Sequence, residues 1–207
     1  GYSASGHPLL AADLHFEPTA PAAVMEAHFS ADPLDVGGVM IPGVPVVWSG
    51  RNADISWAAT GTSAVVLDLF VEAMHPKNPN RYRDAAGWHD IIQREEVILV
   101  RGGESVSMRV RETRRGPLLQ PWFAQEDEPL SLAWTGRLKG NGVAAMLRTV
   151  AAADVEGFRS ELAGHHEPPL IFALADRHGG AAMQLAGWLP LRLFPTRHFP
   201  VPGRSDT

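Results

Sequence analysis

The sequence predicts an α+β fold in which short β-strands outnumber helices. Twenty glycines and 17 prolines are spread over 207 residues, and they favour many short elements over long helices. Apolar, β-branched runs separated by turn-forming residues are typical of strands and dominate the first two thirds of the chain. An alanine-rich stretch over Ala144–Ala153 and an apolar pattern after Asp154 then predict helical segments.

The N-terminal segment predicts a short strand over Pro8–Ala12 that ends at Asp13. Asp13 and His15 are two residues apart, so they share one face of an extended chain. Polar groups at a strand end often face a functional site. The alternative is a solvated strand end with a local hydrogen bond.

A repeated strand and turn pattern organises the stretch from Ile41 to Glu72. Two strands are predicted before this stretch: Ala23–Ser30 with one buried face, and Leu34–Ile41 with a bulge at Gly37-Gly38. Within the stretch, the predicted strands are Val44–Trp48, Ile55–Ala59, and Val65–Val71 buried on both faces. The polar run Ser49–Asn52 is expected to reverse the chain, and Gly61 is expected to form a tight turn. Gly61 lies between Thr60 and Thr62 and allows close backbone approach, which would expose N–H groups to a ligand. The alternative is a glycine that only makes the turn possible.

The residues after position 75 predict a β-rich insertion, a helix and a hairpin. Asp154 is the expected N-cap of a helix in which Val155, Phe158 and Leu162 share one face. The other predicted elements are a hairpin of Glu95–Val100 and Ser105–Arg111, a strand over Leu130–Trp134, and a hairpin of Leu170–Ala175 and Ala181–Trp188. The predicted domains are 1–75 for core strands, 76–140 for the insertion, and 141–207 for a helix plus hairpin returning to the core.

Composition argues against several classes of function. The net charge of −5 implies no basic face, so we expect no nucleic-acid partner. The absence of cysteine excludes disulfides, thiol nucleophiles and thiolate metal sites. No apolar run approaches the roughly 18 residues of a membrane-spanning helix, so we expect no membrane partner. The adjacent His165 and His166 point opposite ways on an extended chain, which argues against a shared metal ion.

Several sequence blocks resemble, in order, the motifs of one known family. The run SGHPLLAADLHF at 5–16 resembles its S-G-K-P-L-L-A-N-D-P-H-L. The stretch from Ile41 to Glu72 resembles its P-G-x-P-x-x-x-x-G-x-N-x-x-I-A-W-G-x-T block. Later blocks similar to its Y-A-D-x-x-G-N-I-G, I-P-x-R and P-V-P-G motifs are Ala173–Asp176 with Gly179-Gly180, Leu191-Arg192, and Val201–Gly203. Ordered blocks are together more specific than any one motif, and in this order they resemble the penicillin acylase (penicillin amidase) family of N-terminal-nucleophile (Ntn) hydrolases.

The resemblance implies a four-layer α-β-β-α sandwich, of which this chain is a part, and an amide hydrolase activity. In this family autocatalytic cleavage exposes an N-terminal Ser, which attacks the amide carbonyl. Its α-amino group, with a pKa of about 7.7–8.0, accepts the hydroxyl proton. Backbone N–H groups and an Asn amide stabilise the oxyanion, at about 2.7–4 kcal/mol per donor. Penicillins, acyl-homoserine lactones, cephalosporins and peptides all stay open as substrates.

The resemblance also assigns roles to positions of this chain. Gly61 falls where the family uses a backbone N–H in the oxyanion hole, and His15 falls beside the nucleophile. The positions that line the acyl pocket in the family are Phe16, Trp48, Ser49 and Ala59. Asp68 matches a calcium ligand, but Val65 replaces its usual acidic neighbour, and calcium takes six to eight oxygens. No cofactor is required for the chemistry, and a structural calcium ion is expected, if anywhere, in the parent protein.

The resemblance places the nucleophile upstream of Gly1 and the oxyanion Asn beyond Thr207. The chain has no initiator Met and no signal-peptide pattern, so we expect a processed or excised piece of an acylase β-chain that is inactive by itself. Its expected partners are a small-molecule acyl amide, the remaining acylase chain segments and, through exposed apolar sheet edges, a second copy of itself. The residues leave the compartment open, and the resemblance is compatible with a periplasmic or secreted protein. The alternative function is a non-catalytic β-rich binding or structural module on the same scaffold.

Overall fold

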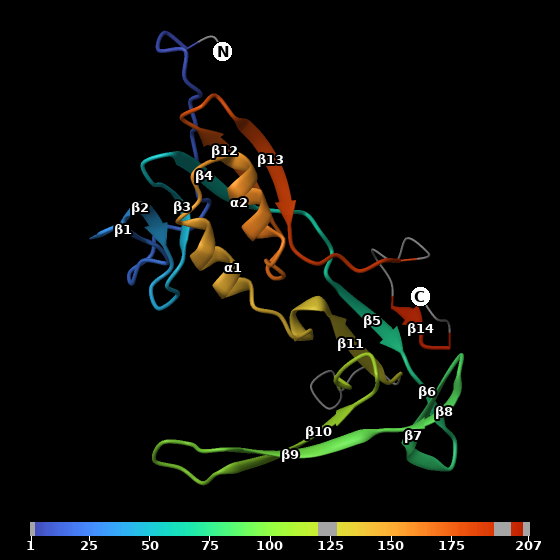
Figure 1. Ribbon diagram of the computed structural model, residues 1–207. Coiled ribbons are helices and arrows are strands. Elements are labelled where there is room, and N and C mark those ends of the chain that lie inside the picture. The colour runs from blue at the N-terminus through green and yellow to red at the C-terminus, as the bar shows by residue number, and fades with distance from the viewer. Residues whose placement is uncertain (1–2, 120–127, 193–199, 205–207) are drawn as a thin grey trace. The chain divides into compact units, whose positions relative to one another are not determined.

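Two units of different architecture make up the chain (Figure 1). The computed structural model describes residues 3–119, 128–192 and 200–204. Unit 1 comprises Gly1–Ala64 with Leu138–Leu189, and unit 2 comprises Val65–Arg137 with Pro190–Thr207. The three-part domain division after residues 75 and 140 stays a prediction. Strands predominate over two short α-helices and one 3₁₀ helix in the described residues, so the predicted β-rich α+β fold is confirmed.

An antiparallel six-stranded sheet with the order β1-β2-β3-β4-β12-β13 forms the centre of unit 1. Its strands are β1 (Met25–Ala31), β2 (Leu34–Met40), β3 (Val47–Arg51), β4 (Ile55–Gly61), β12 (Leu170–Asp176) and β13 (Ala181–Ala186). Helices α1 (Gly142–Thr149) and α2 (Val155–Leu162) pack on one face of this sheet (Figure 1). The adjacent strands β4 and β12 are far apart in sequence, and they pair so that Gly61 lies opposite Leu170.

Aromatic side chains fill the core between this sheet and the helices. Trp57, Phe158 and Phe172 are fully buried. The ring centroids of Trp57 and Phe158 are 5.3 Å apart, and those of Phe158 and Phe172 are 6.0 Å apart. The indole Nε1 of Trp57 donates to the carbonyl of Val47 at 2.9 Å, so this buried polar atom is satisfied. These contacts join α2 to β4 and β12.

The predicted start and buried face of α2 are confirmed. Asp154 Oδ1 accepts a hydrogen bond from the backbone N–H of Gly157 at 2.7 Å, which is the expected N-cap interaction. Val155, Phe158 and Leu162 are the buried residues of the helix. The local signals in the sequence were sufficient here because both the cap and the face are set within two turns of one helix.

A second carboxylate links the start of α2 to the turn between β12 and β13. Asp176 is buried, and its oxygens accept backbone hydrogen bonds from Val155 at 3.1 Å, His178 at 2.9 Å and Gly180 at 2.7 Å. Burial by itself would raise the pKa of Asp176, but these three donors hold that pKa below its ordinary value. The ionised carboxylate therefore stabilises the folded hairpin.

Replacing Asp176 by asparagine is expected to reduce the acid sensitivity of folding. Because the pKa of Asp176 is lower in the folded chain, its carboxylate contributes stability above the unfolded pKa of about 3.9, and this is lost as pH falls through the folded pKa. We therefore expect the unfolding free energy of the wild type to decline more steeply below about pH 4 than that of Asp176→Asn. Urea unfolding at a series of pH values checks this, and equal slopes would contradict it.

Small sheets and a long hairpin make up the described part of unit 2. A sheet of order β11-β5-β14 and a sheet of order β6-β7-β8 accompany the antiparallel pair of β9 and β10. The elements are β5 (Leu67–Val71), β6 (Ala73–His75), β7 (Asn78–Asp84), β8 (Gly87–Asp90), β9 (Ile92–Ile98), β10 (Val106–Glu112), β11 (Leu130–Trp134), the 3₁₀ helix η1 (Thr135–Arg137) and β14 (Val201–Pro202). The predicted β9–β10 hairpin and the predicted strand at β11 are confirmed, whereas β6, β7 and β8 were not predicted. None of the described helices has the length and apolar character needed to cross a membrane.

Two predictions about local structure near the N-terminus are wrong. Pro8–Ala12 has no strand structure. Ser49–Arg51 continues β3 instead of reversing the chain, and the turn comes at Asn52. The Asn52 Oδ1 accepts backbone hydrogen bonds from Asp54 at 2.8 Å and Ile55 at 2.9 Å. An asparagine side chain that bonds to the backbone ahead of it thus decides where the chain turns.

The predicted burial of two strands and the predicted turn at Gly61 are also wrong. In β1 only Ala27 is even half-buried, because this strand is at the edge of the sheet. In β5, expected to be buried on both faces, only Phe70 is buried. Since β4 and β5 belong to different sheets, Gly61 is the last residue of a strand and not the turn of a hairpin. Apolar composition does not by itself indicate which faces are covered.

Candidate functional site

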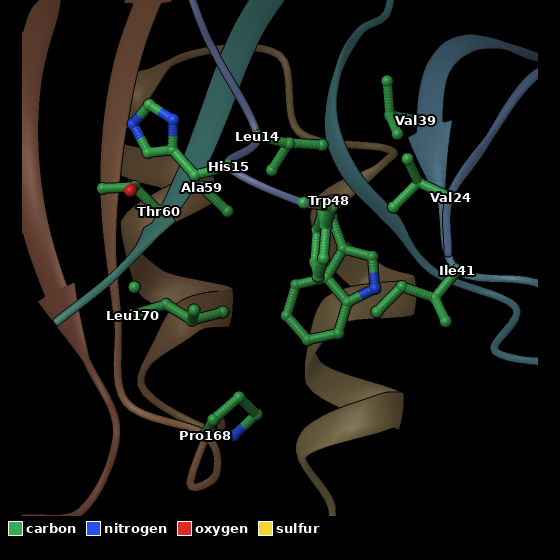
Figure 2. A pocket seen from close by; sticks show the side chains of 12 residues that line it. Leu14, His15, Val24, Val39, Ile41, Trp48, Ala59, Thr60, Pro168 and Leu170 are labelled. Carbon is green, nitrogen blue, oxygen red and sulfur yellow. The ribbon is translucent and has the colours of Figure 1, made fainter. Parts of the chain in front are cut away.

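An apolar cavity of ≈ 590 Å³ lies beside the end of β4 in unit 1 (Figure 2). Small-molecule sites typically measure about 300–1,000 Å³. The lining residues come from the N-terminal segment, the sheet and the segment before β12: Leu14, His15, Phe16, Val24, Val39, Ile41, Trp48, Ala59, Thr60, Gly61, Pro168 and Leu170. The pairing of β4 with β12 brings Gly61 opposite Leu170 in this wall.

The two sides of the cavity differ in polarity. Figure 2 shows His15 and Thr60 on one side, the apolar side chains Val24, Val39 and Ile41 on the other, and Trp48 between them. Gly61 follows Thr60 at the end of β4 and also lines the cavity. The cavity can therefore hold an elongated apolar group with its polar end at the end of β4.

The N-terminal segment places two predicted site residues on the cavity wall. The backbone N–H of Phe16 donates to the carbonyl of Leu14 at 2.8 Å, and this tight turn presents Leu14, His15 and Phe16 together. His15 Nδ1 lies 3.4 Å from Asp13 Oδ2, and both side chains are exposed. His15 therefore has a local partner in Asp13, as in the alternative of a solvated chain segment with a local contact. It also lines the cavity.

Strands β3 and β4 supply the middle of the wall. Trp48 is half-buried, and its indole Nε1 is buried without a hydrogen-bond partner among the described residues. Ser49, predicted to line the acyl pocket, is not among the described lining residues. It is buried, and its Oγ accepts a hydrogen bond from the backbone N–H of Ala59 at 2.9 Å. Ser49 therefore influences the cavity by holding Ala59, which does line it.

The backbone of Gly61 is open on its side-chain face. A Cβ atom added to Gly61 would meet no heavy atom within 4 Å, and the residue is exposed. Its φ angle is not in the left-handed region that favours glycine. Crowding and backbone strain therefore do not explain a glycine here. The predicted role of its N–H in an oxyanion hole stays a prediction.

The predicted calcium ligand Asp68 lies in β5 of unit 2, where it pairs with Arg192. The Nη2 atom of Arg192 is 2.8 Å from Oδ2 of Asp68. Within residues 3–119, 128–192 and 200–204, no group of three or more His, Cys, Asp or Glu side chains is arranged to hold a metal ion.

The adjacent histidines before β12 have separate partners. His165 is buried, and its Nε2 lies 2.7 Å from the carbonyl oxygen of Pro168, a lining residue of the cavity. The Nδ1 of His166 accepts a hydrogen bond from the backbone N–H of Asn141 at 3.2 Å, and its ring packs 4.1 Å from that of Trp188. His165 therefore supports the loop that forms one edge of the cavity.

Several lining residues were not found from the sequence. These are Leu14, Val24, Val39, Ile41, Thr60, Pro168 and Leu170. Most are ordinary apolar residues without a motif, and only the tertiary fold brings them to one place. Thr60 carried a signal, since it flanks the glycine at which the site was predicted.

Comparisons with known proteins agree with this architecture. The sequence profile of the penicillin amidase family matches residues 1–207. The acyl-homoserine lactone acylase QuiP of Pseudomonas syringae pv. tomato is 32% identical over 132 residues, which cover 63% of this chain and 16% of that protein. The penicillin G acylase of Escherichia coli is 30% identical over 118 residues, covering 51% of this chain and 14% of that protein. The matched parts of the chain thus span only 14–16% of the length of these relatives.

A solved structure confirms the predicted fold class. The thermostable penicillin G acylase from Alcaligenes faecalis superposes with a TM-score of 0.78 and 25% sequence identity. The superposition covers 92% of this chain and 34% of that chain, so the described units reproduce part of an Ntn-hydrolase fold. From its sequence and its fold, the chain belongs to the penicillin amidase family.

Proposed function

We propose that this chain supplies the acyl-binding part of an amide hydrolase that transfers an acyl group from an amide to water. The single observation that carries the proposal is the apolar cavity, whose polar side is at the end of β4. Membership of the penicillin amidase family supports the reaction class. The relatives named for acyl-homoserine lactone and penicillin substrates support an acylated small molecule as the substrate.

In this proposal the acyl chain lies among Val24, Val39, Ile41 and Trp48, and the scissile carbonyl lies near Gly61. Burial of the acyl chain contributes about 0.8 kcal/mol per CH₂ group. The attacking hydroxyl belongs to an N-terminal Ser, which the family resemblance places upstream of Gly1. Its α-amino group takes the hydroxyl proton as the tetrahedral intermediate forms.

The developing oxyanion would accept a hydrogen bond from the backbone N–H of Gly61. His15 lies on the same side of the cavity and would contact the substrate near its amide. The second donor, an Asn amide, belongs to a later segment in the family pattern. The proposal therefore predicts hydrolysis by the intact protein and none by the 207-residue chain alone.

The test is hydrolysis of a series of N-acyl amides of increasing acyl length by the intact protein. We expect kcat/KM to rise with acyl length until the apolar side of the cavity is filled. Binding of the same amides without turnover would instead support a non-catalytic binding module on this scaffold. Turnover that does not depend on the acyl group would contradict the assignment of the cavity.

Replacing Trp48 by alanine is expected to shift the acyl preference toward longer or bulkier groups. The indole separates the polar and apolar sides of the cavity, so its removal enlarges the space for the acyl chain. A methylene-sized difference in an apolar pocket is worth about 10–200-fold in selectivity, and we expect at least about 10-fold in the ratio of kcat/KM values. Trp88→Ala, at a partly exposed tryptophan of unit 2, is the matched control and should keep the wild-type profile.

A further inference from the structure

We propose that the guanidinium of Arg192 takes the place of a calcium ion at Asp68, so that this part of unit 2 is held together without metal. The family resemblance assigned Asp68 as a calcium ligand, and the residues around it do not fit that assignment. The proposal concerns unit 2 alone and does not depend on the proposed hydrolase activity.

Arg192 engages both carboxylate oxygens of Asp68. Its Nε lies 3.1 Å from Oδ1 and 2.9 Å from Oδ2, and its Nη2 lies 2.8 Å from Oδ2. The same Nη2 donates to the backbone carbonyl of Val65 at 2.7 Å. A single guanidinium therefore binds the carboxylate of Asp68 in β5 and the backbone carbonyl of Val65, two positions before that strand. Carboxylate and carbonyl oxygens are the kinds of ligand that calcium would bridge.

Among the residues that the structure describes, the His, Asp and Glu side chains near Asp68 are too few to form a metal site. Calcium takes about six to eight oxygen ligands. Val65, Val66 and Leu67 precede Asp68 and offer no side-chain oxygen. A divalent cation bound to Asp68 would also lie within a few ångströms of the Arg192 guanidinium, where the repulsion of like charges is strong. Ion pair and metal site therefore exclude each other.

Partial burial strengthens this ion pair relative to a surface pair. The side chain of Arg192 is 21% exposed and that of Asp68 is 12% exposed, so solvent and salt screen the charges only in part. The contact also has a clear structural consequence. Arg192 itself is held against the start of β5, and β14, later in the chain, pairs in parallel with Phe70 and Val71 at the other end of β5.

The test compares thermal unfolding of the intact protein in millimolar calcium and in excess EDTA, for wild type, Arg192→Gln and Asp68→Asn. We expect both variants to lower the melting temperature by about 2–8 °C, equally in calcium and in EDTA. We also expect any calcium response of the wild type to persist unchanged in Asp68→Asn. Arg177→Gln removes a more exposed pair with Asp54 and is the matched control, with little expected change.

Two results would overturn the proposal. One is a calcium-dependent rise in melting temperature that Asp68→Asn abolishes, since that would make Asp68 a metal ligand. The other is an Arg192→Gln protein as stable as the wild type in EDTA. The double variant Asp68→Asn/Arg192→Gln adds a check. If the two residues form one ion pair, the double variant should lose less stability than the sum of the losses in the two single variants.

Discussion

Replacing Gly61 by proline is expected to lower kcat and kcat/KM for amide hydrolysis by the intact protein by about 10²–10³-fold. The reason is the loss of one N–H that would donate to the oxyanion, since proline has no backbone N–H. Loss of an interaction made only in the transition state lowers kcat and kcat/KM equally, whereas loss of one that binds substrate and transition state alike raises KM. The measurement is steady-state kinetics with the best N-acyl amide of the length series.

The matched control for this change is Gly61→Ala. A Cβ atom at Gly61 meets no heavy atom within 4 Å, and alanine keeps the backbone N–H. We therefore expect Gly61→Ala to keep wild-type activity within a few-fold. Wild-type kcat in Gly61→Pro would contradict the oxyanion role, and an equal loss in both variants would show that added bulk, not the missing N–H, is responsible.

Replacing Glu72 by alanine is expected to destabilise unit 2 by about 3–5 kcal/mol, the usual cost of removing one partner of a buried ion pair. Glu72 is 2% exposed. Its Oε1 accepts hydrogen bonds from Thr113 Oγ1 at 2.9 Å and Ser131 Oγ at 2.7 Å. Its Oε2 lies 3.1 Å from Nη1 of Arg115, whose side chain is only 9% exposed. Alanine would leave a buried cation and two buried hydroxyls without this acceptor.

The loss should be local enough to follow by hydrogen exchange. Arg115 also donates to the carbonyl of Gly203 at 2.8 Å and stacks 4.8 Å from the ring of Phe70, so it joins β5 to the segment after β14. We expect faster amide exchange in β5 and β11 of Glu72→Ala. Glu161→Ala removes an exposed pair with Arg148 and should cost at most about 1 kcal/mol. Similar exchange in the Glu72→Ala protein and the wild type would contradict the assigned role.

Local signals in the sequence predicted much of the secondary structure. The helix α2 followed from its N-cap Asp154 and its apolar spacing, and the hairpins followed from alternating runs around glycine turns. Each of these features is decided by residues within a few positions of one another. The turn after β3 was misplaced because the Asn52 side chain, not the preceding polar run, bonds to the backbone ahead.

The candidate site was predicted only in part. The family resemblance named His15, Phe16, Trp48, Ala59 and Gly61, and the structure places all five on one cavity. The apolar residues that close this cavity could not be named, because nothing in their local sequence distinguishes them from core residues. Ser49 shows the same limit, since its bond to Ala59 depends on the pairing of β3 with β4.

By itself, the sequence determined most of the strands, the N-cap of α2, the absence of cysteine chemistry and, through ordered motifs, the family. Only the tertiary structure decided which strands are neighbours, which apolar faces are covered, and that Arg192 lies against Asp68 across 124 positions of sequence. The physical reason is that caps and periodicity act over a few residues, whereas strand pairing and ion pairing select one partner among many of the same kind. That selection depends on how the whole core packs.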